Sequence, residues 1–371
     1  MSEESESKEG ETREAAPARQ TGLAITLVIV AFGVSLLLAE ILLRVAWRNP
    51  FVNETPDYLI KLERNHPFRD FELDGRALGE ENSRVRFRTN ERGYILPSDQ
   101  FEEPQATIAF LGASTTANPA VSEELRFPAL VSSLLSERGL RVNTLNAGKS
   151  GISSQDSINL LFNQVVFDEP DVAVMMHAHN DIGRLAGKGE YSPRRAGPAS
   201  LATTLRWALQ RGSINSSLIG ALRYWQTIRP FSGTQESDSA ETLLGESQQR
   251  ASEKYVARLK SFIGICRAFG ITPVLMTQPA MKVRTALTPD WTDPRNQEIF
   301  NHLIREVGAE EDVLVIDLVR FFFEGVENWN EPMVVFYDGV HFNNPGSRLA
   351  ASYIADQLYE FVLEPRQTAS E

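Results

Sequence analysis

Four short polar blocks carry the side chains that could do chemistry, and each follows a run of apolar residues. The blocks are GASTT at 112–116, NAGKSG at 146–151, HAHND at 177–181 and YDGVH at 337–341. A serine hydroxyl such as that of Ser114 is a weak nucleophile at neutral pH unless a base takes its proton. A tight turn could set the Asp338 carboxylate on one ring nitrogen of His341 and leave the other nitrogen free as that base. These residue types together predict acyl transfer through a serine nucleophile.

Each block alone has a simpler structural explanation. A serine after a strand commonly caps the next helix, and a glycine-rich loop is usually a plain turn. The Asn180 amide could be a satisfied polar cap, and most Asp-x-x-His pairs are structural. The prediction therefore depends on finding all four blocks at the ends of expected strands.

The elements that must position these blocks alternate between strand-length apolar runs and helical stretches. Strands are expected at 107–113, 142–146, 171–177, 271–277 and 312–318, and helices at 126–139, 153–167, 252–270, 294–308 and 344–362. Such alternation predicts a three-layer α/β/α fold with a mostly parallel sheet. Ligands of such sheets bind outside the carboxyl ends of the strands, where all four blocks fall.

The rest of the chain divides by composition. Residues 1–20 are rich in Glu, Ser and Lys and predict a disordered acidic tail. Residues 22–39 contain no charge and would span about 27 Å as a helix, so we expect a single transmembrane anchor at 21–46. Residues 50–105 predict an irregular lead-in with short strands. Residues 106–364 predict the catalytic domain, with an insertion at about 185–250.

Here the sequence resembles the SGNH, or GDSL-like, hydrolase family, from about Thr107 to Val362. The resemblance is carried by FLGASTT, NAGKSGIS, HAHND and YDGVHFNNPGSRLA. It implies a flavodoxin-like fold and a serine esterase that needs no cofactor or metal. It further implies Ser114 as nucleophile, His341 as general base and Asp338 as the carboxylate that orients it.

The resemblance also implies an oxyanion hole formed by the Ser114 N–H, the Gly151 N–H and the Asn180 side chain. Gly148 is a second candidate for the loop donor, but the spacing from Asn146 favours Gly151. One position departs from the family pattern, because Ala113 stands where the family usually has aspartate. That aspartate is not the triad acid, so its loss affects the geometry of the nucleophile turn.

Composition limits the partners. A net charge of −12 without clustered Lys and Arg argues against nucleic acid. The single cysteine, Cys266, excludes an internal disulfide and lies in an apolar run typical of a buried thiol. We expect a small-molecule, glycan or lipid ester as substrate. Basic residues flank the apolar stretch on both sides, so an extracytoplasmic catalytic domain is expected only from how anchored family members look.

Three alternatives remain open at this stage. His177 and His179 alternate on an expected strand near Asp181, which could indicate a metal site. The same serine chemistry could pass an acyl group to a sugar hydroxyl, as an O-acyltransferase does. A non-catalytic carbohydrate-binding protein could also keep the fold.

Overall fold

A computed structural model of the 371-residue chain describes residues 15–47, 49, 64–74, 84–191, 208, 212–213, 215–227, 246–281, 294–329, 331 and 334–363. Residues 1–14 of the predicted 1–20 tail and much of the 185–250 insertion lie outside these residues, while residues 15–20 are helical. The chain forms two compact units, which we call the helical unit and the α/β unit. The helical unit comprises Met1–Glu54 and Ala199–Thr227, and the α/β unit comprises Thr55–Pro198 and Ile228–Glu371.

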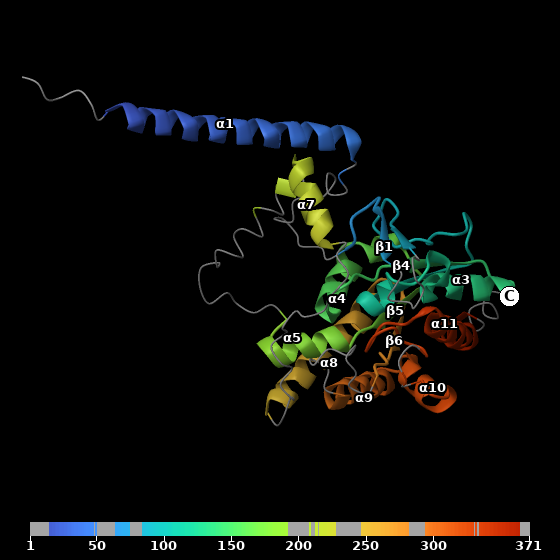
Figure 1. Ribbon diagram of the computed structural model, residues 1–371. Coiled ribbons are helices and arrows are strands. Elements are labelled where there is room, and N and C mark those ends of the chain that lie inside the picture. Colours follow the sequence, from blue (N-terminus) through green and yellow to red (C-terminus); the bar gives the residue numbers. More distant parts are fainter. Residues whose placement is uncertain are drawn as a thin grey trace, which may run out of the picture. The chain divides into compact units, whose positions relative to one another are not determined.

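The helical unit contains a long apolar helix, α1 (Ala15–Ala46), and a shorter helix, α7 (Ser217–Thr227). Figure 1 shows α1 as one unbroken blue helix. It begins ahead of the expected anchor at residue 21, and Pro17 in its first turn is compatible with a helix start. The segment Ala24–Ala46 is long and apolar enough to cross a bilayer, and it is the single candidate span in the described residues. A signal sequence near the N-terminus would pass the same test.

Glu40 of α1 holds the start of α7. Its carboxylate accepts hydrogen bonds from the Ser216 hydroxyl and from the backbone N–H groups of Ser217 and Leu218, at 2.7–2.9 Å. The first N–H groups of a helix have no partner within the helix, so a carboxylate there satisfies them and complements the helix dipole. Arg44, one turn further along α1, bonds to Glu40 and to the Asn215 carbonyl. Part of the predicted insertion is thus joined to the predicted anchor.

The α/β unit contains a five-stranded sheet built from buried apolar runs. Its strands are β3 (Ala106–Gly112), β4 (Val142–Asn146), β5 (Val172–Met176), β6 (Thr272–Met276) and β7 (Val315–Ile316). The strand order is β4-β3-β5-β6-β7, and all four ladders are parallel. This is a doubly wound order, in which the chain goes from β3 to β4 on one side and then to β5 on the other side of β3. Ligands of such sheets bind beyond the carboxyl ends of the two strands where the order reverses, here β3 and β5.

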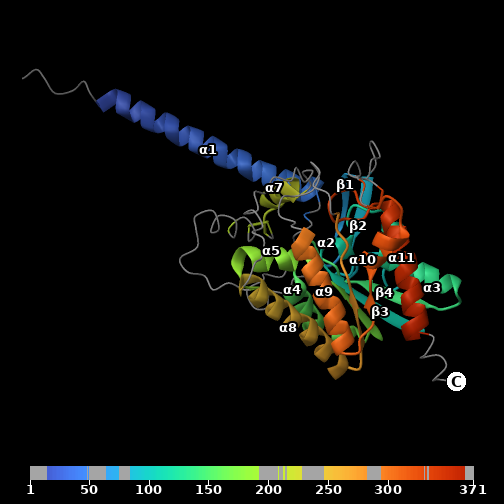
Figure 2. The same cartoon turned by 90° about the horizontal axis from the view of Figure 1, so that it is seen from below.

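Two apolar cores cover the sheet, because alternate strand residues point to opposite faces. Helices α4 (Ser154–Asn163), α8 (Glu246–Ala268) and α9 (Pro294–Glu310) pack on the face that carries Leu111 and Met175. Helices α3 (Phe127–Glu137), α10 (Leu318–Gly325) and α11 (Asn344–Leu358) pack on the face that carries Phe110 and Val174. Figure 2 shows α4, α8 and α9 on one side of the strands and α3 and α11 on the other.

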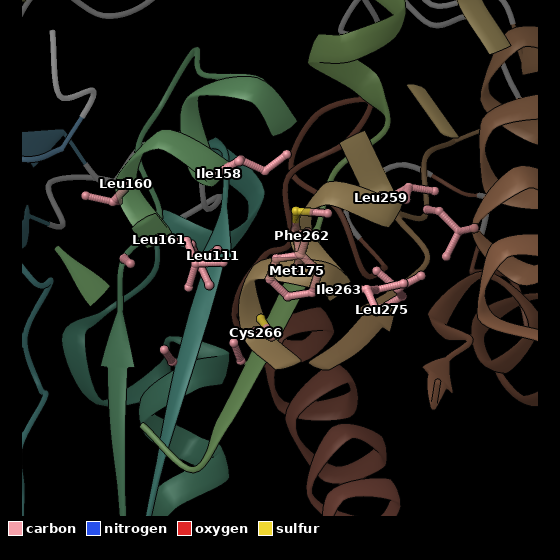
Figure 3. Packing of buried hydrophobic residues seen from close by; sticks show 14 of the residues in the cluster. Leu111, Ile158, Leu160, Leu161, Met175, Leu259, Phe262, Ile263, Cys266 and Leu275 are labelled. Carbon is pink, nitrogen blue, oxygen red and sulfur yellow. The ribbon is translucent and has the colours of Figure 1, made fainter. Parts of the chain in front are cut away.

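Figure 3 shows the first core closely, with Leu259, Phe262 and Ile263 of α8 packed against Met175 and Leu275 of the sheet. The predicted three-layer α/β/α fold with a parallel sheet is confirmed. Cys266, also part of this core, is buried, and burial raises the pKa of its thiol to about 12, so it remains a neutral thiol.

The remaining elements of the α/β unit are short. They are β1 (Asp70–Asp74), β2 (Arg84–Arg88), α2 (Ser114–Ala117), the 3-10 turns η2 (Glu123–Leu125) and η3 (Val165–Asp168), α5 (His179–Lys188) and the π-helical turn η4 (Tyr359–Leu363). Strands β1 and β2 form an antiparallel pair in the lead-in. The strand expected at 312–318 is wrong beyond Ile316, where β7 ends, because the apolar Leu318 begins helix α10.

The lead-in is fastened to the rest of the unit by a buried arginine. Arg126, 1% exposed, donates hydrogen bonds to the carbonyls of Arg86, Leu96 and Asn118. Burial lowers the pKa of Arg126 to about 10. This value is still well above neutral pH, so the guanidinium stays charged. One side chain therefore connects β2, the segment after it and the turn that follows α2.

Candidate active site

The first block forms a sharp turn at the carboxyl end of β3. Gly112 ends the strand, and a Cβ on this residue would lie 2.0 Å from the Thr116 hydroxyl, so a side chain does not fit there. Ser114 is the first residue of α2, and its N–H is one of those that the helix itself does not use. The buried Ala113 stands before it and accepts the N–H of Ala117.

The last block forms a tight turn that presents His341. An isolated bridge joins Phe336 to Phe342, and the Tyr337 N–H donates to the His341 carbonyl. Within the turn, one carboxylate oxygen of Asp338 accepts the N–H groups of Val340 and His341, both at 2.8 Å. The backbone therefore holds the Asp338 carboxylate in place independently of its contact with the His341 ring.

These two turns bring the side chains of Asp338, His341 and Ser114 into hydrogen-bond distance of one another, in that order. The second carboxylate oxygen of Asp338 lies 2.7 Å from His341 Nδ1. On the other side of the ring, His341 Nε2 lies 2.7 Å from Ser114 Oγ. Both distances are hydrogen-bond distances, so the imidazole can hold a proton on Nδ1 and accept one on Nε2.

The charge of Asp338 suits this arrangement. Burial alone would raise the pKa of its carboxyl, but His341 and the N–H groups of Val340 and His341 outweigh burial and leave the pKa below its usual value. Asp338 is therefore ionised at neutral pH. The negative charge of Asp338 beside His341 Nδ1 stabilises the imidazolium that forms when Nε2 takes a proton.

The glycine-rich loop after β4 separates the two donor candidates. The N–H of Gly148 donates to the Asn146 side chain, and a Cβ on Gly148 would lie 2.4 Å from the backbone of Ala117. Gly148 is thus packed behind the nucleophile turn. Gly151 has a φ of +80°, and a Cβ there would meet no atom within 4 Å. Open space therefore adjoins the Cα of Gly151, unlike that of Gly148.

Asn180 lies in the first turn of α5, beyond the end of β5. Its side-chain nitrogen donates to the Ile152 carbonyl at 2.7 Å, one residue after Gly151. This bond uses one of the two amide hydrogens. The Asn180 side chain is therefore connected to the Gly151 loop through the Ile152 carbonyl.

The two histidines before Asn180 take different positions. His177 lies 2.7 Å from the Ser157 hydroxyl and 3.6 Å from Asp181. His179 is buried, and burial followed by repulsion from His341 lowers its pKa to about 3, so its ring is neutral. Among the described residues, no three His, Cys, Asp or Glu side chains are grouped so that they could hold a metal ion.

One residue at this edge of the sheet was missed by the sequence prediction. Gln278 follows the carboxyl end of β6 and is 3% exposed. Its side chain bonds to Thr115 and to the backbone of His179. The rule that functional groups gather at strand ends could have found it, since 277–280 directly follow a strand at this same edge.

The fold and this constellation define a hydrolase-like α/β protein with a serine, a histidine and a carboxylate at its sheet edge. A family model described as the GDSL-like Lipase/Acylhydrolase family matches residues 110–349, more than half of the chain. The chain belongs to this family, so the resemblance given by the four blocks is confirmed. No curated protein matches the chain.

Solved structures of low identity are similar to the chain. A lipase/acylhydrolase from Enterococcus faecalis is 18% identical, with a TM-score of 0.44, over 68% of this chain and 95% of that chain. An acetylxylan esterase from Geobacillus stearothermophilus is 16% identical, with a TM-score of 0.44, over 69% of this chain and 94% of that chain. Similarity at this level carries no information about substrate.

Proposed function

We propose that the chain hydrolyses a carboxylic ester through an acyl-enzyme on Ser114. The observation that carries the proposal is the continuous contact from Asp338 through His341 to the Ser114 hydroxyl, with both hydrogen-bond distances at 2.7 Å. Membership of a family of lipases and acylhydrolases supports ester hydrolysis as the reaction class.

The catalytic steps follow from the position of His341, whose Nε2 faces the Ser114 hydroxyl and can exchange a proton with it. His341 Nε2 takes the proton of Ser114 Oγ while Oγ attacks the ester carbonyl. Donors from Ser114, Gly151 and Asn180 stabilise the oxyanion, and one such donor contributes about 3 kcal/mol to a comparable barrier. The alkoxide leaves with the proton from His341. Water then attacks the acyl-enzyme, His341 takes its proton, and the acid leaves as Ser114 regains a hydrogen.

The proposal extends to the membrane. We infer that α1 anchors the chain in a bilayer and that the α/β unit works outside the cytoplasm on an acylated glycan or lipid. The length and high hydropathy of Ala24–Ala46, which carries charge only at Glu40 and Arg44, support the anchor. Protease added to intact cells tests the orientation, because degradation of the α/β unit requires that it be exposed, whereas protection until the membrane is permeabilised contradicts that part.

The decisive experiment uses the full chain in detergent with a short aryl ester and a fluorophosphonate probe. The probe phosphonylates an activated serine with loss of fluoride. Ser114→Ala should abolish both hydrolysis and labelling, while Ser136→Ala, an exposed serine on α3, should retain both. Activity retained by Ser114→Ala refutes the nucleophile. Sugar acceptors added to the assay identify an O-acyltransferase if acyl-sugar forms faster than free acid.

A further inference from the structure

Gln278 connects the two segments that supply the reacting hydroxyl and the side-chain oxyanion donor. Its side-chain nitrogen donates to the Thr115 hydroxyl at 2.8 Å, and its side-chain oxygen accepts the His179 N–H at 3.0 Å. Thr115 directly follows Ser114, and His179 directly precedes Asn180. A single planar amide at the end of β6 therefore connects the segments that follow β3 and β5.

The backbone of Gln278 is itself fixed to α9. Its N–H donates to the Asn301 side chain at 2.9 Å, and its carbonyl accepts from Asn301 and from Gln297 at 3.0 and 2.8 Å. Thr115, Gln278 and Asn301 are each at most 3% exposed. Water therefore does not compete for these bonds, and the amide is held from both ends.

The chemistry of the site explains why such a bridge matters. A serine must be placed within a few tenths of an ångström of its target while the oxyanion donors stay aligned. The Ser114 turn follows β3 and the start of α5 follows β5. The described pairing of these two strands ends at Gly112 and Met176. Beyond that point the Gln278 amide supplies a side-chain link between them.

We propose that Gln278 is a positioning residue that sets the separation between the Ser114 nucleophile and the Asn180 oxyanion donor. This inference rests on the proposed function. It assigns to Gln278 no contact with substrate, so its loss slows acylation without weakening substrate binding. Because it changes no titrating group, its loss lowers the rate by the same factor across the pH range.

The main variant is Gln278→Met, which keeps the length of the side chain and removes both hydrogen bonds. We expect kcat for an aryl ester and the rate of fluorophosphonate labelling to fall together by about 10–100-fold, as small misplacements of reacting groups do. The KM should change less than about threefold, since ground-state binding is retained. Thr115→Val removes only the bond to Thr115, and its effect should not add to that of Gln278→Met.

Thr277→Val is the matched control. Thr277 directly precedes Gln278. Its hydroxyl donates to Asp317 and accepts the Val319 N–H, and neither bond reaches the Ser114 turn. It should lower the melting temperature while kcat and labelling stay within about twofold of the parent. A purely structural role for Gln278 would make the two variants behave alike.

The outcomes separate this inference from the proposed function. If Ser114→Ala is inactive while Gln278→Met keeps full kcat and labelling, the positioning role is wrong and the nucleophile stands. If Ser114→Ala is active, the nucleophile assignment fails. Should Gln278→Met not fold, Thr115→Val decides, because a normal labelling rate in that folded variant overturns the bridge and a slowed one supports it.

Discussion

His341 Nε2 lies 2.7 Å from Ser114 Oγ, although 227 positions of sequence separate the two residues. The contact depends on two independent turns, one at the end of β3 and one before α11. Neither turn contains both residues, so the distance reports the packing of the whole α/β unit. For this reason, changes that act on either turn should be visible in the rate of acylation.

The first prediction concerns Asp338→Asn. The amide oxygen can still accept the N–H groups of Val340 and His341, so the turn should persist. The amide nitrogen, however, faces His341 Nδ1 and donates to it, which favours the tautomer with a proton on Nε2. That tautomer cannot accept the serine proton. We expect kcat to fall by about 10³–10⁴-fold with an unchanged melting temperature, measured by ester hydrolysis and circular dichroism.

The second prediction concerns acid stability and Asp317. Burial raises the pKa of Asp317, but a two-point bond from Arg305 and bonds from Arg320 and Thr277 outweigh it and leave the pKa below its usual value. A lowered folded pKa gives stability that is present above the unfolded pKa of about 3.9 and is lost as pH falls through the folded pKa.

Asp317→Asn removes this titration. Urea unfolding of the full chain between pH 6 and pH 3 should therefore show a large loss of stability at pH 6 from the substitution and a smaller loss at pH 3. A difference that stays constant over this range would contradict the ion pair as its source.

The third prediction concerns Arg126→Met. The substitution removes the side-chain donor from the carbonyls of Arg86 and Leu96, while the Asn118 carbonyl keeps the Val121 N–H. Each unsatisfied buried acceptor costs about 1–3 kcal/mol, so we expect a loss of at least about 2 kcal/mol. Differential scanning calorimetry measures this loss. The control is Arg138→Met, which changes an exposed arginine at the other end of α3 and should cost under about 1 kcal/mol.

The fourth prediction concerns the start of α7. Glu40→Ala removes the carboxylate that accepts from Ser216, Ser217 and Leu218, and losing a helix cap costs about 1 kcal/mol. Limited proteolysis should cut the 212–227 segment faster, while ester hydrolysis stays unchanged. Glu40→Gln keeps an acceptor and should be cut at an intermediate rate. Equal cutting of all three proteins would show that the contact does not stabilise the segment.

The sequence was sufficient for the sheet because its strands are short apolar runs with clear ends. β3, β4, β5 and β6 fall within one residue of the expected ranges, and the four polar blocks lie at the predicted edge. The same rule failed beyond Ile316, where Asp317 caps a helix whose first residues are as apolar as a strand. Local composition cannot separate these two cases.

Long-range polar contacts were not predictable in this way. The strand-end rule could mark Gln278 as a candidate, but its partners lie 163 and 99 positions away and nothing in its own neighbourhood indicates them. Arg126 stands at the start of an amphipathic helix, where an arginine is usually solvated, yet it is buried against backbone carbonyls. The contacts of such residues are determined by tertiary packing, which the periodicity of hydrophobic residues along the chain does not encode.

The assignment of Ala199–Thr227 to the same unit as α1 has a practical consequence for truncation. A cut after Glu54 would not divide the protein into an anchor and an enzyme. The released piece would retain Ser216 and Ser217 without the Glu40 carboxylate that satisfies them, and with them an unpaired helix start. A clean soluble enzyme therefore requires two excisions, with the internal segment replaced by a short polar linker.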